Sequence, residues 1–400
     1  MIQHMATSYK RPTFIYHREV IEKNIRRLQS CMGDRAELFY SIKANPNPYV
    51  IQTMVENGLG LECSSSFELH GALQSGCDSQ KIICIGPGKS EALLRQCIQA
   101  HIGAIYVESI EEIELIQRLC ASLDLMVDIV LRVHLEKNVG RASVSMSGTH
   151  NPFGMDDNSI HAINQQHQQW DRCHFIGLHY YQGSKQKDPF IIQQHIQASH
   201  EHFRTWQAQW HRPLGMMGLG LGLDTLDDTT LETAICEPLA AIHDGYMALE
   251  CGRCLVADAG QMLCQVQYTK QLNGEAWAIL DTGYHHMMDM CFNTNYLRQY
   301  PHIQPLLKKE GAIKRYHIAG PLCTPSDRLH HAFESSTLQR GDFLLIHHVG
   351  AYAWNHSPLV FLGHAPPDQV FVDHERVHRS NPLYDFINYH KEDHDPTPKH

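Results

Sequence analysis

The sequence has no apolar run that approaches the ~18 residues a membrane-spanning helix needs, and residues 1–10 contain no apolar core of signal-peptide length. Cations are scattered and outnumbered, because 33 Lys and Arg against 43 Asp and Glu give a formal net charge of −10. A nucleic-acid-binding surface needs clustered positive charge. These absences predict a cytoplasmic protein that binds a small molecule and neither a membrane nor a nucleic acid.

Metal-site patterns are missing as well. Cys251 and Cys254 form one Cys-x-x-Cys pair without a second pair to complete a zinc site, and the 30 histidines include no His-Glu-x-x-His motif. No metal site is therefore expected. Thirteen cysteines, an odd number without the spacing of a disulfide framework, indicate mostly free, buried thiols in a reducing compartment.

What the chain does contain is a regular alternation. Its 400 residues, 43% hydrophobic and 19% charged, suffice for two domains. Helical patterns, which include residues 189–210 and 230–246, alternate with apolar, β-branched runs. These runs lie near residues 38–43, 59–63, 81–85, 102–107, 127–133, 174–179, 214–219 and 247–251. Eight such strands predict an α/β fold, a parallel (β/α)8 TIM barrel, with an open doubly wound sheet as the alternative.

The pattern changes after residue 257. Short alternating runs typical of strands are separated by turn signals, and no long helical pattern follows until the tail. These runs lie at residues 263–269, 276–280 and 343–347. We therefore expect a barrel over residues 16–257, a mostly-β C-terminal domain formed by residues 258–389 together with 1–15, and a flexible tail over residues 390–400.

One strand-like run, within residues 37–46, ends in a lysine. In a strand, Lys43 would share one face with Phe39 and Ser41. An ammonium group at the end of a buried strand either reaches solvent or is desolvated enough to be a nucleophile that forms a Schiff base. The choice between these two depends on what the other strand ends carry.

Two other predicted strand ends carry groups that bind anions. Residues 218–222 (GLGLG) end the seventh strand, and Glu250 with Arg253 ends the eighth. Glycines let backbone amides approach a phosphate, an arginine can pair with it, and barrels bind phosphate near these two strand ends. Together with Lys43, these elements predict a site for pyridoxal 5′-phosphate (PLP), with Lys43 bound to its aldehyde.

Six segments, in order along nearly the whole chain, resemble the signatures of the fold-type III PLP-dependent decarboxylases. This alanine-racemase-like barrel family includes the ornithine, arginine and diaminopimelate decarboxylases. The segments are FYSIKAN (39–45), ECSSSFEL (62–69), GLHYYQGS (177–184), ECGR (250–253), GPLCTPSD (320–327) and GAY (350–352).

The resemblance implies a role for each matching residue. Lys43 would hold the PLP aldehyde, Glu250 would face the pyridine nitrogen and favour decarboxylation over racemisation, and Cys323 would come from the neighbouring subunit to reprotonate Cα. A homodimer with shared active sites is therefore expected. Other residues implied to bind PLP are Glu62, Arg132, His179, Tyr181, Ser184, Gly218, Gly220, Gly222, Gly252, Arg253 and Tyr352. Those implied to bind the substrate are Thr324, Asp327, His285 and His286.

Simpler interpretations stay open for some of these residues. Cys323 could be a buried structural thiol, and Asp327 could be a turn or capping residue. Glu62 and Arg132, each expected at a strand end, could simply form an ion pair.

Three departures from the family pattern bear on the chemistry. Tyr181 replaces the histidine that stacks on the PLP ring, and Leu219 interrupts the glycine series. Thr324 stands where the enzymes for basic amino acids and diaminopimelate place the Asp or Glu that holds the distal ammonium group.

Without that carboxylate, the sequence favours a conjugated, partly anionic substrate with a free α-amino acid end. Examples are a citryl-diamino acid intermediate of siderophore biosynthesis and a carrier-tethered glutamyl group. The alternatives are a diaminopimelate or basic amino acid (lysine, ornithine or arginine) decarboxylase and, in another class, a PLP-binding or regulatory homologue with weak turnover.

Overall fold

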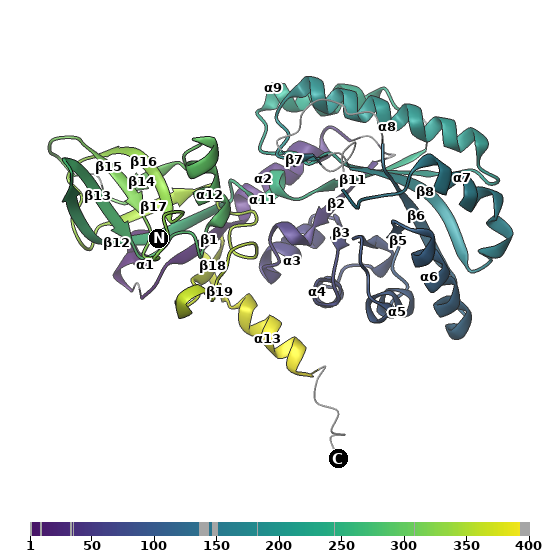
Figure 1. Cartoon of the computed structure of the whole chain (residues 1–400), viewed down its shortest axis with the longest axis horizontal. Coiled ribbons are helices and arrows are strands. Elements are labelled where there is room, and N and C mark those ends of the chain that lie inside the picture. The colour runs from purple at the N-terminus through teal and green to yellow at the C-terminus, as the bar shows by residue number, and fades with distance from the viewer. Residues whose placement is uncertain are drawn as a thin grey trace, which may run out of the picture. The chain divides into compact units, whose positions relative to one another are not determined.

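The computed structural model describes residues 2–8, 10–32, 34, 36–135, 144–145, 151–181, 183–243, 245–307 and 309–392. The chain divides into two compact units, residues 22–255 and residues 1–21 with 256–400, whose elements are labelled in Figure 1. No helix among the described residues is both long and apolar enough to cross a membrane.

The unit of residues 22–255 contains a closed barrel of eight parallel strands, in the order β10-β11-β2-β3-β4-β5-β6-β8. Their bounds are β2 (Ala36–Ser41), β3 (Gly60–Cys63), β4 (Ile82–Cys84), β5 (Ala104–Val107), β6 (Val127–Val133), β8 (Cys173–Tyr181), β10 (Met216–Gly220) and β11 (Tyr246–Cys251). Each strand overlaps one of the eight predicted runs. The predicted barrel is therefore confirmed, and the open-sheet alternative is wrong.

Helices follow the strands and lie on the outside of the barrel (Figure 1). Their starts are set by polar caps. At the start of α4, Ser65 Oγ accepts a hydrogen bond from Glu68 N (3.2 Å), and Glu68 Oε2 accepts one from Ser64 N (2.7 Å). The helices are α2 (Arg18–Gln29), α3 (Pro48–Glu56), α4 (Ser66–Gln74), α5 (Glu91–Gln99), α6 (Ile110–Leu123), α7 (Asp157–Gln165), α8 (Pro189–Gln209), α9 (Asp228–Leu231) and α10 (Glu237–Ala240).

Two local expectations are wrong. Lys43 does not lie in the strand, because β2 ends at Ser41 and the chain turns through the short helix η1 (Ile42–Ala44). Residues 230–246 do not form one helix. A π-helical turn, η4 (Glu232–Cys236), separates α9 from α10, where Pro238 cannot donate a backbone hydrogen bond, and β11 already begins at Tyr246.

The unit of residues 1–21 and 256–400 is mostly β, as expected. In its nine-stranded sheet, β1 (Thr13–His17) lies between β12 (Gly260–Leu272) and β18 (Asp368–Asp373). The other strands are β13 (Glu275–Leu280), β14 (Ile303–Pro305), β15 (Lys314–Ala319), β16 (Arg328–Ser335), β17 (Phe343–His347) and β19 (Arg376–Ser380). Its helices include α1 (Ile2–Thr7), α12 (Met288–Phe292), η5 (Asn293–Leu297) and α13 (Pro382–Glu392). Residues 393–400 of the expected tail lie outside the described residues.

Most cysteines are free thiols, as expected. Eleven of the thirteen are unpaired, and nine of these are buried. Cys254 is partly buried, Cys323 is exposed, and Cys31 and Cys236 are joined by a disulfide.

Candidate active site

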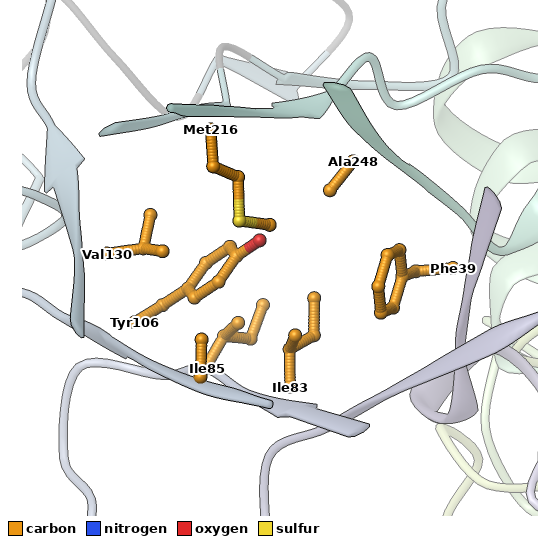
Figure 2. Close-up of a cluster of buried hydrophobic side chains, with 8 residues drawn as sticks. Phe39, Ile83, Ile85, Tyr106, Val130, Met216 and Ala248 are labelled. Atoms are coloured by element: carbon orange, nitrogen blue, oxygen red, sulfur yellow. The ribbon is translucent and has the colours of Figure 1, made fainter. Parts of the chain in front are cut away.

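The interior of the barrel changes from apolar to polar along its strands. The apolar layer consists of Phe39, Ile83, Ala104, Val130, Met216 and Ala248. Figure 2 shows the labelled members of this layer pointing into the barrel. Inward-facing positions recur every second residue of a strand. At the next such positions, toward the carboxyl ends of the strands, lie the side chains of the polar layer. This layer consists of Ser41, Glu62, Tyr106, Arg132, His179 and Glu250, all of them buried.

Lys43 reaches the polar layer from the turn that follows β2. Its Nζ pairs with Glu62 Oε1, and Ser41 Oγ donates a hydrogen bond to Glu62 Oε2. The Glu62 side chain is 1% exposed, whereas that of Lys43 is 37% exposed. A buried carboxylate therefore holds the amine at the carboxyl end of the barrel, where it stays accessible to a ligand. This arrangement does not fit a lysine that simply extends into solvent.

Glu250 lies at the same end of the barrel, in register with Gly220 and Phe39. Its Oε1 is buried and has no hydrogen-bond partner among the described residues. His179 Nε2 lies 3.1 Å from the other oxygen, Oε2. Leaving a buried acceptor unsatisfied costs about 1–3 kcal/mol, and more for a charged group. The site therefore fits a ligand that brings an N–H donor, as the protonated pyridine ring of PLP does.

The glycines at the end of β10 leave room for neighbouring loops. A Cβ on Gly220 would lie 2.2 Å from Tyr181 Cδ2, and one on Gly222, whose φ is +57°, would lie 1.8 Å from Gly183 O. Gln186 N donates to Gly222 O at 3.0 Å, so backbone packs directly on backbone here. Ser184 belongs to the same loop, in β9 (Gly183–Ser184). The predicted phosphate-binding segments are thus brought together as a cradle that larger residues would fill.

Leu219 does not interrupt this cradle. It is fully buried, and strand alternation sends its side chain to the outer face of β10, between an inward Gly218 and an inward Gly220. The leucine therefore interrupts the glycines in the sequence but not on the inner face of the barrel. After the adjacent β11, Gly252 and Arg253 follow directly, and Arg253 begins the short helix α11 (Arg253–Val256).

Arg132 and Glu62 do not pair with each other, which corrects one of the simpler interpretations. Arg132 Nη1 donates to Glu108 Oε1 at 2.9 Å, and Glu108 Oε2 accepts from Gly154 N at 2.9 Å. The Arg132 guanidinium carbon lies 5.8 Å from the centre of the Tyr181 ring. Arg132 therefore stands beside the residue expected to stack on PLP.

The sequence analysis missed Glu108 and Tyr106. Glu108 directly follows β5, as an acidic residue at a strand end, and this position was the available signal. Tyr106 resembles an ordinary core residue in the sequence, but its hydroxyl points toward the middle of the barrel (Figure 2). Burial, followed by the charge of Glu250, raises the pKa of Tyr106 well above its usual value.

The remaining candidate residues belong to the unit of residues 1–21 and 256–400 and are described within it. Cys323 is the exposed free thiol, so its interpretation as a buried structural thiol is wrong. Tyr352 has a φ of +61°. Thr324 is half-buried, and its Oγ1 accepts a hydrogen bond from Ser326 N at 3.4 Å.

Asp327 is buried and fixes two loops. Its Oδ1 accepts from Tyr284 N at 2.6 Å, and its Oδ2 accepts from Leu322 N at 2.7 Å. Burial raises the pKa of Asp327, and these two backbone donors oppose the rise. Since both carboxylate oxygens already have partners, the structure favours the turn-residue interpretation over direct substrate contact.

His285 and His286 are fully buried in the same unit. Burial lowers the pKa of His285 to about 4 and that of His286 to about 2, so both are neutral near pH 7. They line a cavity of about 580 Å³ together with Lys10, Arg11 and His364. Any contact of these histidines with a ligand would be made from the wall of this cavity.

Residues 18–263, more than half of the chain, match the family described as "Pyridoxal-dependent decarboxylase, pyridoxal binding domain". The chain is 27% identical over 403 residues to the L-glutamyl-[BtrI acyl-carrier protein] decarboxylase of Niallia circulans, a match covering 96% of this chain and 94% of that protein. It is 24% identical over 377 residues to the 2-[(L-alanin-3-ylcarbamoyl)methyl]-2-hydroxybutanedioate decarboxylase of Staphylococcus aureus, with 90% and 93% covered.

The fold is also similar to that of a solved structure. The diaminopimelate decarboxylase from Helicobacter pylori, in complex with L-lysine, superposes with a TM-score of 0.84 at 21% identity. The match covers 98% of this chain and 100% of that chain.

Proposed function

We propose, from the premise that this chain belongs to the family of pyridoxal-dependent decarboxylases, that it removes the α-carboxylate of a conjugated amino acid. The protein is an amino acid decarboxylase with PLP as its cofactor. The observation that carries the substrate proposal is Thr324, a neutral residue where a carboxylate would hold a distal ammonium group. A substrate with a conjugated, partly anionic distal end does not need that carboxylate.

The polar layer supplies the groups that this reaction needs. Bound PLP supplies the electron sink for the electrons released as CO2 leaves. Lys43, held by Glu62, would bind the PLP aldehyde, and its amine lies where it could also move a proton. The unpartnered Oε1 of Glu250 accepts the pyridine N–H and favours the protonated ring.

The cradle formed by the loops after β8 and β10 holds the phosphate in this proposal. Gly220 and Gly222 contribute close backbone approach, and Ser184 contributes a hydroxyl. Arg253, directly after β11, contributes a positive charge. Tyr181, packed on Gly220, would lie against the cofactor ring. These residues would fix the position of bound PLP, and positioning is a main route to a lower barrier.

We assign reprotonation of Cα to Cys323 of a second subunit. Its exposed thiol supports this role, because a group that acts in a neighbouring active site must lie at the surface. Asn295 Nδ2 donates to Ser326 O at 2.8 Å and so ties η5 to the Cys323 loop. The same helical segment exposes Phe292, Tyr296 and Leu297, an apolar face suited to a second copy of the chain. Asp327 positions the Cys323 loop.

Two relatives support a conjugated substrate. The name of the Niallia circulans protein specifies a glutamyl group on a carrier protein, and that of the Staphylococcus aureus protein specifies an amino acid joined through an amide to a hydroxybutanedioate. We propose that the substrate of this chain resembles the second of these, the amide-linked amino acid, and that the reaction is a step of siderophore biosynthesis in the cytoplasm. The alternative, a diaminopimelate or basic amino acid decarboxylase, is supported by the similarity to the Helicobacter pylori enzyme.

The test is CO2 release by PLP-loaded protein from a panel of amino acids. The panel contains lysine, ornithine, arginine, meso-diaminopimelate, 2,3-diaminopropionate and a citryl-diaminopropionate conjugate, with Cys323→Ala as the control for reprotonation. Turnover of the conjugate alone supports the proposal. Efficient turnover of meso-diaminopimelate or a basic amino acid would refute it, and a protein that binds PLP without releasing CO2 from any of them would favour a regulatory homologue.

A further inference from the structure

Inside the barrel, Glu250 is accompanied by a histidine and a tyrosine. His179 Nε2 lies 3.1 Å from Glu250 Oε2, and the side chains of both residues are at most 2% exposed. The ring of Tyr106 lies 5.0 Å from that of His179, tilted by 48°. His179 therefore lies within donor distance of the carboxylate, and Tyr106, whose pKa is raised by burial and then by the charge of Glu250, lies in the same polar layer.

These donors have nothing else to bind. Neither ring nitrogen of His179, nor the Tyr106 hydroxyl, has an aligned hydrogen-bond partner among the described residues. Buried polar groups are normally satisfied, and an unsatisfied one needs an explanation. Phenylalanine and leucine would fill the same space without this cost. Catalytic hydrogen bonds are often poorly aligned in the absence of ligand and tighten when it binds.

Gly218, in the middle of β10, packs closely against the side chains of both His179 and Tyr106. A Cβ on Gly218 would lie 3.1 Å from His179 Cδ2 and 3.1 Å from the Tyr106 hydroxyl oxygen. Gly218 therefore has a different use from Gly220 and Gly222, which pack against the loop after β8. The backbone of β10 makes room for the histidine and the tyrosine, as it does for the cradle.

We propose that His179 and Tyr106 are positioning residues for Glu250. Their N–H and O–H groups orient the carboxylate through Oε2, which leaves Oε1 to accept the N–H of the pyridine ring. The inference rests on the proposed role of Glu250 at the ring nitrogen.

Two further titratable groups face this network. The charge of Glu62 is a smaller cause of the raised pKa of Tyr106. Burial, followed by the charge of His179, lowers the pKa of His195 on α8 to about 3, so His195 is neutral at working pH. Glu62 cannot replace a donor at Glu250 Oε2, because a carboxylate only accepts and Glu62 already binds Lys43 and Ser41.

The experiment compares PLP-loaded wild type with Tyr106→Phe and His179→Gln. The control is Tyr180→Phe, which removes an equally buried phenol from the outer face of β8, where its hydroxyl is 2.9 Å from His202 Nδ1. The measurements are the absorption spectrum of bound PLP against pH and the dissociation constant of PLP. A hydrogen bond to a charged group corresponds to roughly a tenfold or larger effect.

We expect both variants to shift the midpoint of the pH titration of the PLP absorption spectrum, the spectral midpoint, to lower pH by about one unit. We also expect them to weaken PLP binding about tenfold. The shift is downward because a Glu250 carboxylate that is no longer held toward the ring nitrogen favours ring protonation less. Tyr180→Phe should change neither quantity. If Tyr106→Phe and His179→Gln behave like Tyr180→Phe, the inference is overturned. Tyr106→Phe, which deletes a single oxygen, decides the matter even if His179→Gln does not fold.

Glu250→Gln separates this inference from the assignment on which it rests. If Glu250→Gln shifts the spectral midpoint and the two positioning variants do not, only the inference fails. If Glu250→Gln leaves the midpoint unchanged, the assignment of Glu250 to the ring nitrogen fails, and the inference fails with it.

Discussion

In the apolar layer of the barrel, side chains such as Ile83 and Met216 pack against one another. Among the described residues, the unsatisfied polar atom next to this packing is the Tyr106 hydroxyl, which belongs to the polar layer. One inward-facing position further along the strands, the polar layer holds charged groups, and one of them, Glu250, has an oxygen without a partner among the described residues. The apolar layer is satisfied as it stands, whereas the hydrogen bonding of the polar layer is complete only with a ligand. A barrel can therefore derive stability from one layer and chemistry from the next.

The largest effect is expected at the lysine of the polar end. Lys43→Ala should abolish the absorption band of lysine-bound PLP and slow decarboxylation by about a thousandfold or more, because the covalent anchor is lost. The matched control is Lys81→Ala at the opposite end of the barrel, where Lys81 pairs with Glu37. Spectra and CO2 release should be unchanged in the control. An equal loss of PLP absorption and CO2 release in both variants would contradict the assignment of the chemistry to the polar layer.

A substitution in the apolar layer should have the opposite signature. Ile83→Ala leaves a cavity in a packed layer and should lower the free energy of unfolding by about 2–5 kcal/mol, as measured by urea denaturation. The absorption band of bound PLP should keep its position and its pH dependence. A shifted band with unchanged unfolding would show that the lower layer takes part in the site.

The cradle provides a smaller, graded test. Gly220→Ala places a methyl group 2.2 Å from Tyr181 Cδ2, so the ring must move. Overpacking of this size costs roughly 1–3 kcal/mol, and we expect PLP affinity to fall about tenfold or more. Gly88→Ala is the control, because a Cβ at Gly88 has no neighbour within 4 Å. Titration with PLP measures both, and equal affinities would argue against the cradle.

Buried histidines outside the polar layer should affect stability rather than the cofactor. Burial lowers the pKa of His195 to about 3 and that of His286 to about 2, below the unfolded value near 6.5. Their contribution is therefore present above pH 6.5 and is lost as the pH falls toward the folded pKa. As the pH falls below 6.5, each of these two histidines should lower the free energy of unfolding by about 1.4 kcal/mol per pH unit.

This pH dependence can be assigned to individual residues. The free energy of unfolding of wild type, His195→Asn and His286→Asn is compared at pH 7.5 and pH 5.5. Each variant should lose less stability than wild type between the two values. Parallel pH profiles for all three proteins would count against neutral burial of these histidines.

The fold followed closely from the sequence, because the apolar runs that form the barrel strands are buried along most of their length and most of the intervening helices carry side-chain caps. Lys43, Glu250 and the glycines were identifiable, since they lie in or directly after the ends of strands and parallel strands bring these ends together. The single helix expected over residues 230–246 failed because hydrophobic periodicity does not reveal the π turn or the start of β11 at Tyr246.

The partners of the charged groups were harder to predict. Arg132 binds Glu108 and not Glu62, and His179 meets Glu250 across β10. Both contacts depend on the stagger of strands around a closed barrel, which no local pattern encodes. Tyr106 was missed for a related reason, because a tyrosine in an apolar run predicts core packing and only the closed barrel shows where its hydroxyl points.

The polar end of this barrel should hold PLP on Lys43. The direct measurement is borohydride reduction of the PLP-loaded protein, which converts a lysine-bound cofactor into a stable pyridoxyl group, followed by peptide mapping by mass spectrometry. We expect a single pyridoxyl label on the peptide that contains Lys43. A label on another lysine, such as the buried Lys89 that pairs with Glu112, or no label on any peptide, would contradict it.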